Sequence, residues 1–258
     1  MSGAPDPTRV AITAGAGGIG REIARAFAGK DTRVAVCDAD AAAVTAAADD
    51  GLDAQVVDVA DGEALDRWLD GVLERFGGLD VLVNNAGIAG PTALVEDIDP
   101  ADWERCIAID LSSHFRASRR VIPAMKAAGA GSIINLSSTS GLVGCGMRAP
   151  YVAAKWAVIG LTKTLAIELG PHGVRANAIC PGSVDGERMR GVIHREASAR
   201  GLDRSVVERE YIGGQSISRF VQPGEIADMC VFLASDAARM VTGQAIAVDG
   251  HTETFHLS

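Results

Sequence analysis

Short apolar runs alternate along this chain with longer segments whose apolar residues recur every three or four positions. Several of the short runs are followed by glycine, asparagine or aspartate, which is typical of strands. The runs lie at 10–13, 32–37, 54–59, 79–83, 132–136, 174–179 and 245–248. The longer segments have helical periodicity; they lie at 19–27, 41–50, 64–76, 101–128, 151–169 and 223–233. Strands that alternate with helices predict a mostly parallel sheet covered on both faces. We therefore expect a single α/β domain, a three-layer doubly wound sheet of the Rossmann type.

Residues 183–222 break this alternation, because they are rich in charge and weak in periodicity. A loop of this length within a compact domain usually has a function. We expect it to form a lid over a substrate.

A glycine-rich turn joins the first predicted strand to the first predicted helix, with Gly15, Gly18 and Gly20 in the turn and Ile19 at the start of the helix. Backbone N–H groups of such a turn, together with a helix N-terminus, bind a pyrophosphate. A tight turn without a ligand remains the alternative.

Asp38 ends the second predicted strand, eighteen residues after Gly20. A carboxylate at this position accepts hydrogen bonds from an adenosine ribose and repels a 2′-phosphate, so the sequence favours NAD over NADP. Asp38 could instead cap the helix that begins near Asp40, or do both. Asp58, at the end of the third predicted strand, is a candidate for binding adenine, with a surface or capping role as the alternative.

The next two strands also end in polar or small residues, Asn84-Asn85-Ala86-Gly87 and Ser138. Small residues let a backbone pass close to a cofactor, and asparagine side chains brace neighbouring strands. Ligands of parallel sheets bind outside the carboxyl ends of the strands. The shared edge therefore predicts one binding site for all of these segments.

Tyr151 and Lys155 are four residues apart in a predicted helix, so their side chains share one face. A cation near a phenol favours the ionised phenol, which can accept a proton from an alcohol. Ser138 could hydrogen-bond the oxygen of that alcohol or of a carbonyl. A chance pairing on a helix surface is the alternative interpretation of the Tyr–Lys spacing alone.

Composition narrows the partners of the predicted site. The chain has 258 residues, 48% of them hydrophobic, and a formal net charge of −9. An acidic protein of this kind is expected to bind a small molecule rather than nucleic acid or an anionic membrane. No apolar run approaches the roughly 18 residues of a membrane span, so we expect a soluble cytoplasmic protein. The five cysteines form no C-x-x-C pair and the five histidines show no ligand spacing, so no metal site is predicted.

Taken together, these motifs resemble the short-chain dehydrogenase/reductase family from about residue 10 to residue 250. The shared elements are Gly18-Ile19-Gly20, Asn84-Asn85-Ala86-Gly87, Ser138, Tyr151 with Lys155, Pro181-Gly182 and Val248-Asp249-Gly250. The resemblance implies that Tyr151 is the general acid/base and that Ser138 orients and polarises the substrate oxygen. It implies that Lys155 favours the ionised phenol and binds the nicotinamide ribose. The implied contacts to NAD are Gly15, Gly18, Ile19, Gly20, Asp38, Asp58, Val59, Asn85, Ala86, Gly87, Tyr151, Lys155, Pro181, Gly182 and Val184.

Three positions depart from the family pattern. Ala14 replaces the first glycine of the turn, and Asp110 aligns with the helix asparagine that helps to hold a proton-relay water. We expect Asp110 to take that catalytic place, because a carboxylate also accepts a hydrogen bond from water. Gly186 stands where a threonine often contacts the nicotinamide, so this contact is lost.

The residues expected to border the substrate flank Tyr151 or begin the lid; they are Ser140, Cys145, Met147, Arg148, Arg188 and Met189. The arginines suggest an anionic or polyhydroxylated substrate, although arginines in a mobile segment are often only solvated. The preferred hypothesis is an NAD-dependent dehydrogenase that moves hydride between NAD(H) and a secondary alcohol or ketone. The alternatives are a 3-oxoacyl or other ketone reductase and a catalytically silent NAD-binding sensor. The resemblance also implies a homotetramer, with the C-terminal strand at one interface.

Overall fold

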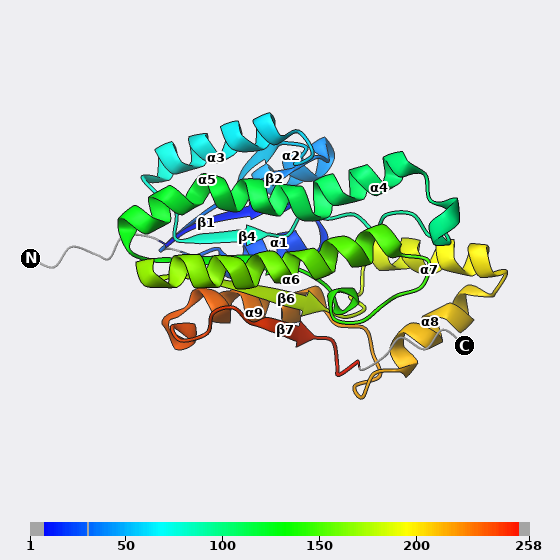
Figure 1. The fold of residues 1–258 in the computed structure, drawn as a ribbon. Coiled ribbons are helices and arrows are strands. Elements are labelled where there is room, and N and C mark those ends of the chain that lie inside the picture. Colours follow the sequence, from blue (N-terminus) through cyan, green and yellow to red (C-terminus); the bar gives the residue numbers. More distant parts are fainter. Residues whose placement is uncertain (1–7, 30, 253–258) are drawn as a thin grey trace, which may run out of the picture.

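All seven strands form one parallel sheet in the computed structural model, which describes residues 8–29 and 31–252 (Figure 1). The strands are β1 (Thr8–Thr13), β2 (Thr32–Asp38), β3 (Asp53–Val56), β4 (Val81–Asn84), β5 (Gly131–Leu136), β6 (Val174–Pro181) and β7 (Ala245–Val248). Their order in the sheet is β3-β2-β1-β4-β5-β6-β7. The chain first winds from β1 outward to β3 and then returns to β4 on the other side of β1, so the predicted doubly wound fold is confirmed.

Helices connect the strands. They are α1 (Gly18–Phe27), α2 (Ala41–Asp49), α3 (Gly62–Phe76), α4 (Pro100–Ile107), α5 (Ser113–Ala128), α6 (Ala149–Leu169), α7 (Glu187–Arg200), α8 (Arg204–Gly213) and α9 (Pro223–Ala234). Of these, α1, α2, α3, α6 and α9 lie where the periodicity predicts helices. Aspartates start several of them. The side chains of Asp40 and Asp61 each accept two backbone N–H bonds from the first turns of α2 and α3. Such caps satisfy N–H groups that have no partner within the helix.

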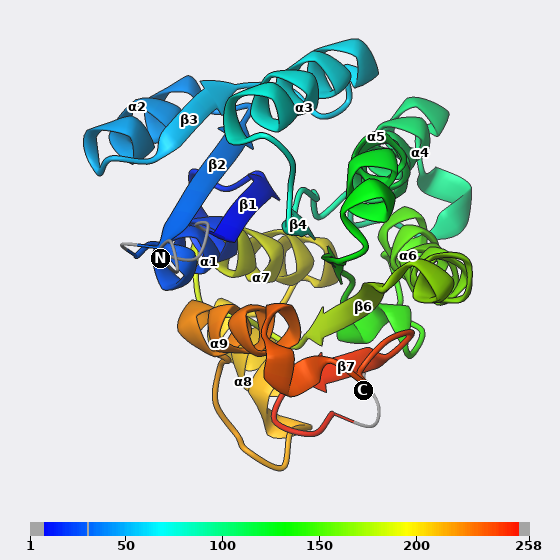
Figure 2. The same cartoon turned by 90° about the vertical axis from the view of Figure 1, so that its left-hand side faces the viewer.

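Two apolar layers sandwich the sheet, because successive strand residues point to opposite faces. Ala11, Leu82 and Ile133 face the layer formed by α3, α5 and α6, whereas Ile12 and Val83 face the layer of α1, α2 and α9. Figure 2 shows α3, α5 and α6 on one side of the sheet and α1 and α9 on the other. The three-layer architecture follows from this alternation.

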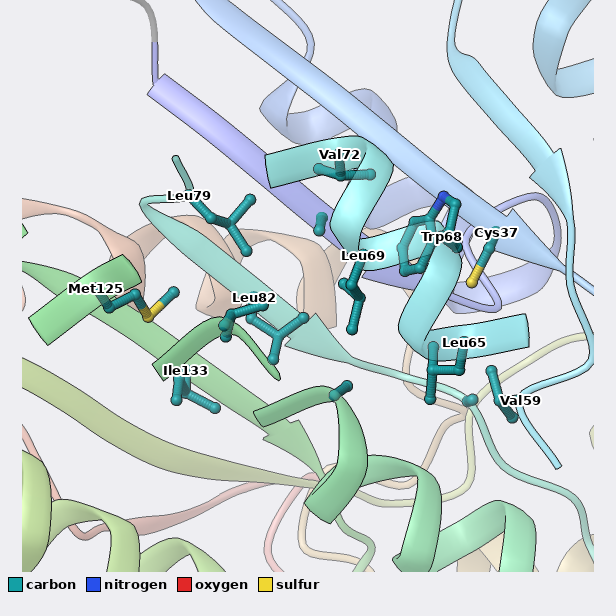
Figure 3. Close-up of a cluster of buried hydrophobic side chains, with 14 of the residues drawn as sticks. Cys37, Val59, Leu65, Trp68, Leu69, Val72, Leu79, Leu82, Met125 and Ile133 are labelled. Carbon is teal, nitrogen blue, oxygen red and sulfur yellow. The ribbon is translucent and has the colours of Figure 1, made fainter. Parts of the chain in front are cut away.

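The first layer contains the large buried side chains of α3 (Figure 3). Trp68 and Leu69 belong to one buried cluster with Leu82 of β4, Met125 of α5 and Ile133 of β5. Leu69, Leu82, Met125 and Ile133 are fully buried. Truncating one such leucine to alanine costs about 2–5 kcal/mol, so this layer holds the strand ends of the site in place.

The third strand ends earlier than predicted, at Val56 rather than residue 59. The next residues form a turn, in which Val57 N–H donates to the Asp38 carbonyl and Asp58 Oδ1 accepts from Ala60 N–H at 2.9 Å. An aspartate that bonds the backbone two residues on favours a turn over an extended strand.

The predicted long helix 101–128 is divided into α4 and α5 by a π-helical turn, Ala108–Ser112. Such turns insert one extra residue into an α-helix and are frequent at functional sites. This one contains Asp110, whose side chain is completely buried.

The expected loop at 183–222 is wrong in part, because α7 and α8 occupy most of it. Figure 1 shows both helices beyond the end of the sheet to which the strand arrows point. Their buried apolar residues are few, mainly Ile193, Ala197 and Val207, which explains the weak periodicity. The pair is also held by Arg200, which bonds Glu196 at 2.9 Å and Glu210 at 2.5 Å.

Candidate active site

A cavity of about 660 Å³ opens at the carboxyl ends of the central strands, beneath α7. Most of the predicted site residues line it; these are Gly18, Ile19, Asp38, Asn85, Gly87, Ser138, Ser140, Cys145, Arg148, Tyr151, Lys155, Pro181, Gly182, Val184, Arg188 and Met189. The predicted residues outside its lining are Gly15, Gly20, Asp58, Val59, Ala86, Asp110 and Met147. Residues from distant parts of the sequence therefore meet at the edge that the topology selects.

The glycine turn is crowded on its protein side and open on its cavity side. A Cβ on Gly20 would lie 2.1 Å from the Ala14 carbonyl oxygen and 2.6 Å from Asn85 Nδ2. A Cβ on Gly17 or Gly18 would meet no atom within 4 Å. The turn therefore leaves room for a pyrophosphate beside the N-terminus of α1, and its residues fit a dinucleotide.

Ala14, which replaces the first family glycine, adopts φ = +50°. This left-handed conformation is costly for a residue with a side chain. The turn therefore holds an alanine in a backbone conformation that favours glycine. It keeps its conformation at the expense of strain at Ala14.

Asp38 lies in the cavity wall and accepts hydrogen bonds from Ala16 N–H at 3.3 Å and Asp40 N–H at 3.2 Å. The N-cap of α2 is Asp40, whose Oδ1 accepts from Ala42 N–H at 2.9 Å. The alternative in which Asp38 caps the helix is therefore wrong. Asp58 is exposed and its carboxylate stabilises the turn after β3, so its contact with adenine stays a prediction.

Asn85 links the end of β4 to the glycine turn. Its Nδ2 donates to the carbonyls of Thr13 and Ala14, at 3.1 and 2.9 Å, and the Thr13 hydroxyl accepts from the N–H groups of Asn85 and Ala86. On the other side, Asn84 Nδ2 donates to Asn135 Oδ1 at 2.8 Å. The expected bracing role of these asparagines agrees with this geometry.

Tyr151 and Lys155 project from the first turns of α6, and Ser138 approaches them from the end of β5. Lys155 is 2% exposed and donates from Nζ to the Leu136 carbonyl at 2.9 Å; Nζ lies 5.7 Å from the centroid of the Tyr151 ring. The Ser138 hydroxyl oxygen accepts from Ser140 N–H at 3.1 Å, which leaves its proton available for a substrate oxygen. The structure thus brings three of the four predicted catalytic side chains, Ser138, Tyr151 and Lys155, into one cavity.

A family model described as enoyl-(acyl carrier protein) reductase matches residues 14–251 of the chain. The chain belongs to the short-chain dehydrogenase/reductase family. It is 45% identical over 194 residues to a trans-4-hydroxycyclohexanecarboxylate dehydrogenase from Sinomonas cyclohexanicum, a match that covers 75% of the chain and 68% of that relative. This short-chain dehydrogenase/reductase is therefore an oxidoreductase that transfers hydride between a nicotinamide cofactor and a secondary alcohol or ketone.

Solved structures of the family agree with the fold. An NAD⁺-bound xylitol dehydrogenase matches with a TM-score of 0.90 and 30% identity, over 95% of the chain and 99% of that structure. An actinorhodin polyketide ketoreductase with NADPH matches with a TM-score of 0.89 and 32% identity, over 95% and 96%. The family fold thus accepts both nicotinamide cofactors.

Asp110, which the resemblance aligns with the family asparagine, does not line the cavity. Its Oδ1 accepts from Ile88 N–H at 2.6 Å. A Cβ placed on Gly87 would lie 3.2 Å from Asp110 Oδ1 and 3.3 Å from Lys155 Nζ, so the two buried charges flank Gly87. Burial, strengthened by the Asp110 charge, raises the pKa of the neighbouring Cys106 thiol to about 12.

Gly186, where the family often has threonine, has φ = +152°. A side chain rarely adopts this conformation, so glycine at this position suits the backbone entering α7. Next to it, Val221 pairs through its backbone with Ser183 and Asp185, the residues on either side of Val184. This pairing leaves the peptide groups of Val184 available for a ligand.

His114 is a site-supporting residue that the sequence reasoning missed. Its completely buried ring contacts the Ala86 carbonyl through Nε2 at 3.0 Å, and its Nδ1 has no partner. A carbonyl only accepts, so Nε2 carries the proton. Burial, together with the charge of Lys155, lowers the pKa of His114 to about 3. The neutral ring therefore supports the segment that follows β4.

Two arginines surround the Tyr151 ring. The Arg148 guanidinium carbon lies 4.8 Å from the ring centroid and that of Arg188 lies 5.8 Å from it. Cys145 also lines the cavity, and burial raises the pKa of its thiol, so it is not an activated nucleophile.

Within residues 8–29 and 31–252 no cluster of three or more histidine, cysteine or acidic side chains could hold a metal ion. The described part of the chain also contains no helix that is long and apolar enough to span a membrane.

Proposed function

We propose that the protein is an NAD-dependent dehydrogenase that oxidises a secondary alcohol, with Tyr151 as the general base. One observation supports this most strongly. A single cavity holds the open glycine turn and Asp38 at one end and Ser138, Tyr151 and Lys155 at the other.

In the proposed reaction three side chains of the cavity have separate roles. The Ser138 hydroxyl donates to the substrate oxygen and orients it. Tyr151 takes the hydroxyl proton, and the Lys155 ammonium stabilises the phenolate that accepts it. The bound nicotinamide supplies the hydride acceptor. In the opposite direction Tyr151 returns the proton to a ketone oxygen.

The preference for NAD rests on Asp38, whose carboxylate lies in the cavity wall. The 2′-phosphate of NADP carries negative charge, so the Asp38 carboxylate would repel it. Asp38→Ala should weaken NAD binding and reduce the discrimination against NADP. Equal affinity of the unmodified protein for both cofactors would show that Asp38 does not select between them.

The alternative of a ketone reductase is supported by the ketoreductase structure that contains NADPH. The relative from Sinomonas cyclohexanicum, in contrast, is named for oxidation of an alcohol that also carries a carboxylate. We favour oxidation, with cyclic and acyclic hydroxy acids among the first substrates to test.

The test is steady-state reduction of NAD and NADP with a panel of secondary alcohols, sugar alcohols and hydroxy acids. Tyr151→Phe should lower kcat by about 10²- to 10⁴-fold while fluorescence titration shows unchanged NAD binding. Substantial turnover by this variant would remove Tyr151 from its role. Tight NAD binding without turnover of any alcohol or ketone would favour the sensor alternative.

We also propose that the protein forms a homotetramer in the cytoplasm. Phe115 of α5 and Trp156 and Ile167 of α6 expose 52%, 51% and 78% of their surface, and β7 leaves one edge of the sheet unpaired. Exposed apolar residues on adjacent helices are typical of a subunit interface. Sedimentation of the protein and of Trp156→Glu tests this, because a monomeric wild type would contradict it.

A further inference from the structure

Arg148 is the only buried arginine in the described part of the chain, with 8% of its surface exposed. Its Nη2 donates to the Ala89 carbonyl at 2.9 Å. Its Nε is buried without a hydrogen-bond partner, and among the described residues no carboxylate lies within 4 Å of its guanidinium. A buried cation is normally paired, because removal from water is costly for a charge. Arg148 therefore lacks a counterion within the part of the protein that the structure describes.

The contact with Tyr151 compensates for this burial only in part. The Arg148 guanidinium carbon lies 4.8 Å from the ring centroid, which is within the range of a cation–π interaction. A ring face attracts the cation but accepts no directed N–H bond in the guanidinium plane. The buried Nε has no access to the cavity that Arg148 lines. The guanidinium nitrogen left for an acceptor there is Nη1, which makes no hydrogen bond to a described residue.

Arg188 adds a second cation from the lid. It stands in the first turn of α7, donates from Nη1 to the Gly87 carbonyl at 3.1 Å and lies 5.8 Å from the Tyr151 centroid. No ion pair joins it to a described acidic residue, whereas Arg190 on the same helix pairs with Asp185 at 3.1 Å. Arg188 is thus a second cation without a carboxylate partner at this ring.

Three acidic residues line the cavity: Asp38, Asp185, which pairs with Arg190, and the exposed Glu187, which forms no ion pair with Arg148 or Arg188. Glu196 of α7 accepts from Arg200 at 2.9 Å and from the Tyr211 hydroxyl at 2.6 Å. Asp110, behind Lys155, accepts from Ile88 N–H. Asp38 belongs to the glycine-turn end of the cavity. The Tyr151 end of the cavity is therefore cationic, formed by Arg148, Arg188 and Lys155.

We propose that Arg148 and Arg188 bind a carboxylate of the substrate, so that the enzyme acts on a hydroxy acid or the corresponding oxo acid. The proposal rests on the proposed function, because it assigns a role in the same cavity. A guanidinium matches a carboxylate through parallel N–H bonds in one plane. Because both cations lie at the ring that bears the general base, the carboxylate and the reacting carbinol belong to one compact molecule. Arg148 and Arg188 determine specificity, while Tyr151 moves the proton.

The test compares matched acids and amides. Wild-type enzyme is assayed with NAD and 4-hydroxycyclohexanecarboxylate, 3-hydroxybutyrate and the corresponding carboxamides. We expect a preference for the acids. Arg148→Met should lower kcat/KM for a preferred acid by about 10- to 150-fold, the loss typical of a charge-assisted hydrogen bond. The loss of kcat/KM for the matching amide should be smaller, so the ratio of kcat/KM for acid to that for amide should fall, and Arg148→Lys should restore part of the preference.

Further variants control for the lid and for folding. Arg188→Met should lower the acid preference as well. Arg195→Met removes an exposed charge from the same helix outside the cavity lining, and it should change neither substrate. Thermal unfolding and NAD titration show whether Arg148→Met is folded. If it is not, Arg148→Lys and Arg188→Met still test the proposal.

A binding measurement separates this proposal from the proposed reaction. Cyclohexanecarboxylate has no hydroxyl to oxidise, and calorimetry on the enzyme with NAD measures its affinity alone. Binding that Arg148→Met abolishes supports the carboxylate site even if no alcohol is turned over. Equal kcat/KM for acids and amides, or equal binding of cyclohexanecarboxylate by Arg148→Met, would overturn it while leaving the reaction class intact. A preference for a phosphate ester of an alcohol over the acids would overturn the choice of carboxylate.

Discussion

Acidification should destabilise the fold through His114, a residue on α5 that supports the cofactor-facing end of β4. Its ring donates from Nε2 to the Ala86 carbonyl and leaves Nδ1 without a partner in a fully buried position. Protonation would add an N–H at Nδ1 that finds no acceptor among the described residues. The folded protein therefore resists binding this proton, whereas the unfolded chain binds it freely.

The size of the effect follows from the two pKa values. Burial and the charge of Lys155 lower the pKa of His114 from 6.5 to about 3. Between these values the unfolded state binds more protons than the folded state, so stability is lost as the pH falls below 6.5. Each pH unit below 6.5 lowers the free energy of unfolding by about 1.36 kcal/mol. The free energy of unfolding should therefore be about 2 kcal/mol lower at pH 5 than at pH 8.

Urea unfolding at pH 8 and pH 5 measures this loss, with His114→Gln as the matched variant. The Gln amide can still donate to the Ala86 carbonyl but does not titrate. Arginines lower the pKa values of aspartates such as Asp50 and Asp80. Protonation of these aspartates in acid therefore also reduces the stability of the fold. The informative quantity is therefore the difference between the two proteins. If His114→Gln loses as much stability as the wild type between pH 8 and pH 5, the reasoning is wrong.

Three further predictions follow from the strand ends. Gly20→Ala should lower the free energy of unfolding, measured in urea, by at least about 1–3 kcal/mol, because its Cβ would lie 2.1 Å from the Ala14 oxygen. Gly17→Ala should keep its stability, because its Cβ would meet no atom within 4 Å. Equal losses in the two variants would contradict the crowding argument. Ala14→Gly should stabilise the protein by about 0.5–1 kcal/mol, since relief of about 1–2 kcal/mol of left-handed strain exceeds the added entropy of the unfolded chain; a lower midpoint in urea would count against strain. Asp110→Asn should retain turnover, because an amide oxygen can still accept from Ile88 N–H, and loss of kcat with unchanged thermal stability would reveal a need for the carboxylate.

The sequence was sufficient for the sheet because each strand is a compact apolar run next to a helix of clear period. It was insufficient for the π-helical turn at Ala108–Ser112, since one inserted residue changes the helical phase only slightly. It was also insufficient for α7 and α8, where few apolar positions are buried. Local pattern predicts an element well where the element buries a broad apolar face.

For the site, spacing and position at strand ends, together with the family resemblance, selected Ser138, Tyr151 and Lys155 as catalytic candidates. The sequence did not predict which polar side chains of the site are buried. His114 shows no ligand spacing, and only the fold places its ring in a closed space under Ala86. Arg148 could have been a solvated arginine ahead of the helix, and only the fold removes its charge from water.

The contrast between the whole protein and its cavity explains why net charge is a poor guide to the substrate. A formal charge of −9 disfavours long-range attraction of an anion. At physiological ionic strength, however, charges on the surface are screened over about 8 Å, whereas buried charges are screened much less. Arg148 and Lys155 are buried beside Tyr151, so they act on a ligand only after it enters the cavity. Recognition of a carboxylate there is consistent with an acidic exterior, which repels polyanions such as nucleic acid and leaves the choice of a small anion to two arginines.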